Sequence, residues 1–448
     1  MSNFLKSAFQ IVLVFIFIAV YWNGAVKQLS RVNTDMKKTD QEAYMNYARK
    51  LYESDYQYKG GRNRMPVYPF VQSLFYHPAM SDEFFFTQGK YINLILSLVI
   101  LAGLTLIFQK FFDKLLTINL TLIIGFTVFM FKAPFFQAEI LFYFLNSCLF
   151  LLMWLFLERP SWIIAILIGI VAGFAHLTKA SILPGFLIFL VILVIKSIWI
   201  YFQKRKTNSP KVTFNYLTSN ILVIPLIGMF FLATVFPYIL TSKRVYGNYF
   251  YNVNSTFYMW YDSWKEAKQG TRAHGDRKGW PDMPSEDIPS MAKYLNEHSA
   301  QQTLNRFVKG GRAVFGNVVN SYGYFKYFIV FMIALIVSII NQRKLALTIF
   351  ASRPMLIFFL ASYFTAYLLL YAWYGLIVHE NRLILAQFIL IMFTISMGLQ
   401  SLLRSSRIRI GEHSFHTLTI FNIGVFIFLI FDISLVLTMR VETMFGGN

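Results

Sequence analysis

Long uncharged apolar runs alternate with polar connections along almost the whole of this 448-residue chain. A helix needs about 20 apolar residues to cross the hydrocarbon core of a bilayer. By that measure the pattern predicts about eleven spanning helices, at residues 8–24, 91–109, 115–131, 136–157, 162–178, 181–201, 218–239, 325–340, 354–373, 383–402 and 417–439. We therefore expect an all-α polytopic membrane protein that forms one domain over residues 1–448.

Two polar connections, residues 25–90 and 240–324, are much longer than the others. Long loops in a compact protein are usually functional or disordered. These two are rich in Tyr, Trp, Asn and Gly, but neither holds enough apolar sequence for a core of its own. We expect both to form ordered surface on one face of the membrane domain, with an interfacial helix in the first.

The net charge of +20 raises the possibility of a nucleic-acid partner, but the distribution of charge argues against it. With a cytoplasmic N-terminus, most basic residues between spans fall in cytoplasmic loops. The short outer loops then hold Lys132, Lys179 and Arg382, with Arg440 in the tail. Basic residues in short loops mark the cytoplasmic side. The chain is thus expected in the inner (plasma) membrane as a multi-pass protein, with both long loops outside.

Two features limit the chemistry further. The N-terminal apolar run lacks a small-x-small cleavage site, which favours a retained first helix over a signal peptide. Cys148 is the single cysteine and lies inside a predicted span, so no disulfide or zinc framework is expected.

The segment TDQEAYMNYARKLYESD, residues 39–55, is a charged helical pattern inside the first long connection. Thr39 and Glu42 have the spacing of a capping box, and Asp40 in the first turn suits the helix dipole. The apolar positions Tyr44, Tyr47, Ala48 and Leu51 share one face. Taken alone, this pattern is typical of an interfacial helix along the bilayer, with its acids as ordinary caps.

Other ionisable residues are predicted on the same side of the membrane. They are Arg62 and Arg64 in GRNRMPVYPF (60–69), Glu139 at the start of the fourth span, His176 and Lys179 at the end of the fifth, and His379, Glu380 and Arg382 at the start of the tenth. Charged groups at or in spans are costly and mark functional sites. We therefore expect one site on the outer side.

Several short motifs occur in a family-like order. They are Asp40, Glu42, Tyr44 and Ala48, then Pro66-Val67-Tyr68-Pro69, then Glu139, then Gly173 to Lys179 (GFAHLTK), and finally Arg244 with Gly247. This set resembles the GT-C superfamily of membrane glycosyltransferases. More narrowly, it is similar to the dolichyl-phosphate-mannose protein mannosyltransferase-like group, which includes the lipid A aminoarabinose transferases. The likeness covers residues 8–260, and Gln41 separates two acids that are adjacent in the family pattern.

The resemblance implies an enzyme that moves a sugar from a polyprenyl-phosphate donor to an extracytoplasmic glycan, glycolipid or protein. Asp40 would be the general base that deprotonates the acceptor hydroxyl. Direct displacement with one base would invert the anomeric centre, as in inverting glycoside hydrolysis. Glu139 would orient the acceptor or, with Asp40, hold a divalent metal. Two carboxylates are weak evidence for a metal site, so no cofactor is expected.

Cationic side chains would stabilise the leaving phosphate in such an enzyme. Lys179, Arg382, Arg62 and Arg64 are the candidates, and the substrate-binding set also includes Glu42, Tyr44, Tyr68, Arg244 and His379. Simpler roles exist for the cations: Lys179 as a snorkelling side chain, Arg382 as an interfacial anchor or partner of Glu380, and the other two as solvated or headgroup contacts. The aromatic stretch 254–267, NSTFYMWYDSWKEA, suits a sugar face or the membrane interface equally.

Two other functions fit a polytopic chain. A transporter or flippase of a lipid-linked sugar would carry polar or broken helices near the bilayer midplane. The ionisable groups here gather at one edge instead, which favours chemistry at one surface. A scaffold in envelope assembly is the third interpretation.

Overall fold

The computed structural model describes residues 3–58, 60–205, 222–321, 323–378, 381–410 and 413–440. Within these ranges, ten helical segments are long and apolar enough to cross a membrane. They are formed by α1 (Asn3–Lys27), α4 (Asp82–Phe108), α5 (Lys114–Ile124) with α6 (Met130–Lys132), α7 (Glu139–Glu158), α9 (Leu183–Arg205), α11 (Val223–Tyr246), α16 (Tyr324–Asn341), α18 (Pro354–Tyr374), α19 (Arg382–Leu403) and α20 (Thr417–Leu435).

The remaining predicted span, residues 162–178, is the shorter apolar helix α8 (Trp162–Thr178). Its 17 residues lie at the lower limit for crossing a bilayer, and it packs between α7 and α11. Residues 218–221 of the seventh predicted span lie outside the described residues. The prediction of a helical, multi-pass membrane protein is therefore confirmed.

One small sheet departs from the all-α prediction. Strands β1 (Arg407–Ile410) and β2 (His413–His416) pair antiparallel between α19 and α20, with Arg407 opposite His416. The alternation of basic and apolar residues in RIRI fits a strand, and it lies outside the apolar runs from which the helices were predicted.

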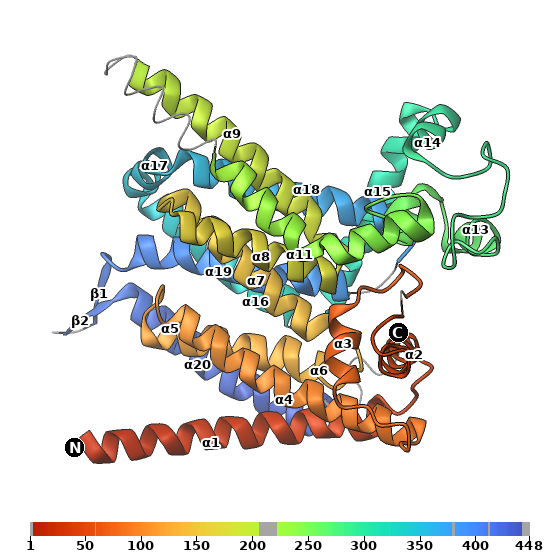
Figure 1. Cartoon of the computed structure of the whole chain (residues 1–448). Coiled ribbons are helices and arrows are strands. Elements are labelled where there is room, and N and C mark those ends of the chain that lie inside the picture. The colour runs from red at the N-terminus through yellow and green to blue at the C-terminus, as the bar shows by residue number, and fades with distance from the viewer. Residues whose placement is uncertain are drawn as a thin grey trace.

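Figure 1 shows the long helices side by side in one bundle, with their connections gathered at two ends. Helices α2 (Gln41–Glu53), α3 (Val67–Ser73), α13 (Trp264–Gln269) and α14 (Met291–Glu297) lie at one end. The β1–β2 hairpin and α17 (Arg343–Ser352) lie at the other. Both long connections are thus at the same end, which we call the loop end.

The two long connections are tied to each other at the loop end. The Val253 amide donates to the Arg62 carbonyl at 3.3 Å, and the Tyr246 hydroxyl donates to the Gly60 carbonyl at 3.3 Å. Gly247 ends α11 in the left-handed conformation (φ 76°) that favours glycine at a helix C-terminus. The second connection then holds α12 (Val253–Thr256), α13, α14 and the longer α15 (Ala300–Asn320).

Burial within the bundle separates inner from outer helices. Helices α5, α7 and α19 are largely buried, whereas α1, α11 and α16 leave most of their apolar surface exposed, as lipid-facing helices do. Near the loop end, Asp432 of α20 accepts hydrogen bonds from Lys326 Nζ at 2.6 Å and from the Tyr327 hydroxyl at 2.7 Å. This acid therefore has its partners within the bundle.

Candidate active site

The turn that precedes α2 differs from the predicted capping box. The N-cap residue is Asp40 and its side chain caps no backbone amide. Thr39 has a positive φ of 60°, incompatible with the extended backbone of a capping residue, and its hydroxyl accepts from Gln137 Nε2 at 2.7 Å. The capping-box prediction is therefore wrong, because the Thr39 hydroxyl contacts the segment before α7 instead. The prediction that Tyr44, Tyr47, Ala48 and Leu51 share one face is confirmed, and the structure buries that face inside the protein.

A buried amide network holds the start of α2 against the start of α7. Gln41, which is completely buried, accepts from the Phe136 amide at 2.9 Å and exchanges two hydrogen bonds with Asn33, at 2.7 and 2.9 Å. Gln41 follows Asp40 directly, and Gln137 precedes Glu139 by two residues. The network therefore brings the two acids to one place. It also gives a structural role to the residue that interrupts the acidic motif.

Five charged side chains meet at this junction. Asp40 forms ion pairs with Arg64 and with Arg382, the latter at 2.7 Å between Oδ2 and Nη1. Glu139 pairs with Lys179 at 2.6 Å and lies 3.5 Å from Arg382 Nη1. We call these five residues the Asp40 cluster. Three positive and two negative charges leave it with an excess of one positive charge.

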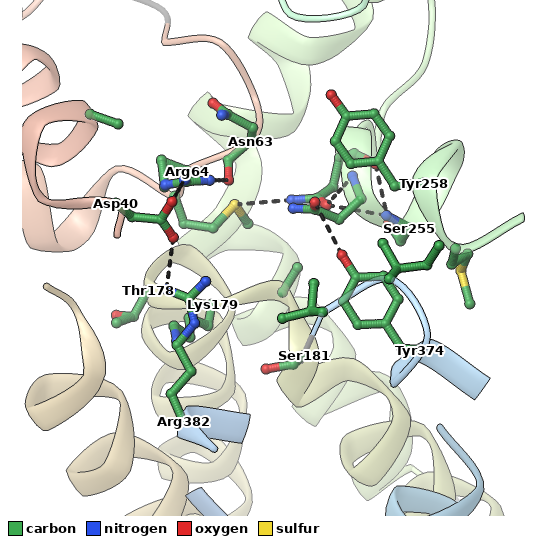
Figure 2. A pocket seen from close by; sticks show the side chains of 18 of the residues that line it. Asp40, Asn63, Arg64, Thr178, Lys179, Ser181, Ser255, Tyr258, Tyr374 and Arg382 are labelled. Carbon is green, nitrogen blue, oxygen red and sulfur yellow. Dashed lines mark hydrogen bonds and ion pairs between the residues drawn. The ribbon is translucent and has the colours of Figure 1, made fainter. Parts of the chain in front are cut away.

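The electrostatics of the cluster set the state of Asp40. Burial alone would raise the pKa of its carboxyl, but the positive charges of Arg64 and Arg382 outweigh this effect and lower the pKa from 3.8 to about 2. Asp40 is therefore ionised at neutral pH. Its two oxygens are each occupied by a guanidinium group, as Figure 2 shows.

Arg382 is positioned by the backbone as well as by charge. Its carbonyl accepts a hydrogen bond from the Tyr143 hydroxyl at 2.8 Å, which links the first residue of α19 to α7. Tyr143 lies one helical turn after Glu139. The same helix therefore supplies an acid to the cluster and fixes the backbone of one of its cations.

A cavity of about 940 Å³ opens beside the cluster. Its wall includes Asp40, Arg64, Lys179 and Arg382 on one side, and Ser255, Tyr258 and Tyr374 on the other (Figure 2). Apolar residues of α9 and α18, among them Leu183, Pro184 and Leu370, complete the wall toward the spanning helices. Ligand sites in proteins usually have volumes of about 300–1,000 Å³.

The other predicted site residues are distributed in three ways. Glu42, Tyr44 and His176 line the cavity. Arg62 and Tyr68 are buried behind it: Arg62 packs over the Tyr238 ring at 3.7 Å, and the Tyr68 hydroxyl accepts from Gln72 and Asn93. The interpretation of Arg62 as a solvated residue is thus wrong. Arg244 is exposed on α11 away from the cavity, and His379 lies outside the described residues.

Sequence reasoning missed the wall that the second connection contributes. Lys268, Arg272 and Arg277 line the cavity together with Tyr258, Met259 and Trp264. The aromatic stretch 254–267 was singled out from the sequence, and five of its residues line the cavity: Asn254, Ser255, Tyr258, Met259 and Trp264. The basic residues that follow it were a usable signal, because positive charge beside aromatic rings suits an anionic or sugar ligand.

No group of three or more His, Cys, Asp or Glu residues within the described ranges is arranged to hold a metal ion. Comparisons of the chain with protein-family models, curated proteins and solved structures found no match.

Proposed function

We propose that the protein is an integral membrane glycosyltransferase that moves a sugar from a polyprenyl-phosphate-linked donor to an extracytoplasmic acceptor, with inversion. The single observation that carries the proposal is the Asp40 cluster. Two carboxylates and three cations, from five separate segments, converge beside a cavity at the loop end of a membrane bundle. A lipid-linked donor would reach this cavity from the bilayer, which explains why the enzyme is embedded there.

The excess positive charge of the cluster suits the phosphate of the donor. Arginine matches phosphate oxygens with a planar pair of donors, and lysine acts as a point charge. Lys179, Arg64 and Arg382 would take the phosphate and stabilise the negative charge that develops as it leaves. Glu139, held between Lys179 and Arg382, would keep both cations oriented for that contact.

The same contact would activate the base. A carboxylate with a pKa of about 2 is a weak proton acceptor, because general bases work best with a pKa near the operating pH. A phosphate that draws Arg64 and Arg382 away from Asp40 removes the charges that lower its pKa. Asp40 would then become an effective base for the acceptor hydroxyl when the donor is bound, and remain inactive without it.

A flippase of a lipid-linked sugar is the alternative function. It would need polar groups along a path through the bundle. Helices α2 and α13, which both contribute to the cavity wall, lie at the loop end of the bundle (Figure 1), and this favours catalysis at one surface.

Replacement of the base gives the decisive test. Asp40→Asn should reduce sugar transfer by about a hundred- to ten-thousandfold, because asparagine keeps the shape but cannot accept the proton. Glu42→Gln is the matched control, since Glu42 also lines the cavity but takes no part in the ion pairs that join the five residues of the Asp40 cluster. Envelope glycans, glycolipids and glycoproteins would be compared by mass spectrometry in a deletion strain complemented with each variant, followed by measurement of the turnover of the purified protein.

Normal transfer by Asp40→Asn would refute the role of Asp40. Transport of a lipid-linked sugar without cleavage of its glycosidic bond would favour the flippase.

A further inference from the structure

The cavity has a second group of cations, separate from the Asp40 cluster. Lys268, Arg272 and Arg277 all line it from the second connection. Within the described ranges, no carboxylate oxygen lies within 4.0 Å of their charged nitrogens, in contrast to the cations of the Asp40 cluster. Six basic and two acidic residues line the cavity in total. Half of that positive charge is therefore on a wall without a compensating ion pair.

Two of these cations are arranged around one aromatic ring. The Arg272 guanidinium lies 5.2 Å and Lys268 Nζ lies 5.9 Å from the centre of the Trp264 ring. Trp264 packs edge-to-face on Tyr258 at 5.3 Å, and both rings line the cavity. A cation over an aromatic face is weakly held in place but keeps its N–H donors available. The wall thus combines charge with a flat apolar surface of the kind that a sugar ring contacts.

The third cation is on a rigid piece of backbone. The Tyr246 hydroxyl donates to the Arg277 carbonyl at 3.0 Å, and the Tyr251 hydroxyl donates to the Asp276 carbonyl at 2.6 Å. The Asp276 side chain is fully buried behind the wall and accepts from the Tyr258 hydroxyl at 3.3 Å. Burial raises the pKa of this carboxyl, and the charges of Arg277 and Arg272 oppose that shift. A preorganised cation has less conformational freedom to lose on binding.

We infer that Lys268, Arg272 and Arg277 form a second anion subsite, which binds a phosphate-class group of the acceptor while the donor phosphate occupies the Asp40 cluster. The inference rests on the proposed function, because that function requires a donor and an acceptor that bind as separate substrates. One transfer needs both substrates in the cavity at once. Two cationic groups on two walls allow two anionic substrates to bind together without competing for one site.

Binding to the purified protein in detergent separates the two subsites. Glucose 1-phosphate is the soluble probe, with glucose as its neutral counterpart, and undecaprenyl phosphate is the lipid probe. Arg272→Gln and Lys268→Gln test the second subsite, since both residues are partly or fully exposed and tolerate replacement. Lys265→Gln is the matched control, because Lys265 is on the same helix α13 but does not line the cavity. Lys179→Ala tests the Asp40 cluster, and its thermal unfolding is measured together with its binding because the substitution also removes a buried partner of Glu139.

We expect the Arg272→Gln/Lys268→Gln double variant to bind glucose 1-phosphate at least tenfold more weakly than wild type, while Lys265→Gln binds it normally. Undecaprenyl phosphate binding should be lost in Lys179→Ala and retained in the double variant. The inference would be overturned if wild type and the double variant bound glucose 1-phosphate equally well. It would also be overturned if neither protein bound glucose 1-phosphate detectably. Loss of undecaprenyl phosphate binding in the Arg272→Gln/Lys268→Gln variant would mean that these cations bind the phosphate of the donor. That result would also overturn the inference. Failure of wild type to bind undecaprenyl phosphate would count against the proposed function alone.

Discussion

The Asp40 carboxylate is held by two guanidinium groups, and this arrangement determines how its contribution to stability depends on pH. Its pKa is lowered from 3.8 in the unfolded chain to about 2 in the folded protein. A group with a lowered folded-state pKa stabilises the fold above its unfolded value, and that stability is lost as the pH falls through the folded value. At neutral pH the shift corresponds to about 2 kcal/mol.

We therefore predict that wild type is more stable than Asp40→Asn by about this amount at pH 5–8. The difference should shrink as the pH falls from 4 toward 2. Thermal unfolding of both proteins in the same detergent, measured across this pH range, is the appropriate experiment. A difference that grows on acidification would mean that Asp40 is protonated in the folded state.

The Glu139–Lys179 pair is more deeply buried than the pairs of Asp40. Glu139 is 1% exposed and Lys179 14%. Loss of one partner of a buried ion pair costs roughly 3–5 kcal/mol. Without Lys179, the buried charge of Glu139 would be offset mainly by the more distant Arg382, at 3.5 Å. Lys179→Met should therefore destabilise the protein strongly, and Lys179→Met/Glu139→Gln should recover most of the loss. Thermal unfolding of the single and double variants tests this. If the single and the double variant are destabilised equally, another cation must compensate the charge of Glu139 when Lys179 is absent.

All five residues of the Asp40 cluster were predicted from the sequence as site residues, but the amide network that supports them was not. Glu139, Lys179 and Arg382 were found because ionisable residues at span ends are unusual. Asp40 and Arg64 were found in the charged segments of the first long connection, and the structure brings all five together. Gln41 and Gln137 were not found, because a buried amide looks like any polar loop residue until its partners are known. Their partners lie about a hundred residues away in the chain, beyond the reach of local patterns.

At the scale of elements, α15 is held directly against α18, which carries Tyr371 and Tyr374 of the cavity wall. Gly310 makes this possible: a Cβ at this position would lie 1.7 Å from the Ala372 carbonyl oxygen. Gly310→Ala should separate the two helices and lower both stability and activity. The neighbouring Gly311 has no atom near its Cβ position. Gly311→Ala should therefore be neutral or stabilise the helix by up to about 1 kcal/mol.

Thermal unfolding and transfer activity of the two variants test this contact. The comparison is well matched because the substitution, the helix and the chain position are nearly identical. Similar behaviour of Gly310→Ala and Gly311→Ala would mean that the two helices can separate without effect on the site.

The elements themselves were largely predictable, because apolar runs of spanning length have few alternatives to helix in a bilayer. The exceptions are informative. The π-helical turn η2 (Gly125–Phe129) lies inside the third predicted span and leaves no trace in its hydropathy. The start of α2 was misassigned since Thr39, a β-branched residue, takes a left-handed backbone conformation that local rules disfavour.

At the scale of the whole molecule, the loop end is predicted to face away from the cytoplasm. The basis is the asymmetry of basic residues in the short loops. Single cysteines in a Cys148→Ala background test this. Lys50→Cys and Lys278→Cys are exposed near the loop end, and Lys114→Cys and Arg404→Cys are exposed in connections between spans that are predicted cytoplasmic. An impermeant thiol reagent should label the first pair in intact cells, and the second pair only in broken membranes. The reverse pattern would place the cavity in the cytoplasm.

The ion pair between Lys326 and Asp432 has a consequence for how the chain is made. Helix α20 carries a carboxylate that is unfavourable in lipid, and its partners are on α16, about a hundred residues earlier in synthesis. A nascent chain that released α20 into the bilayer by itself would have to bury that charge without Lys326 and Tyr327. We therefore expect α20 to insert more efficiently when α16 is still close to the insertion machinery as α20 emerges. Assembly of the bundle and completion of the chain would then be coupled steps.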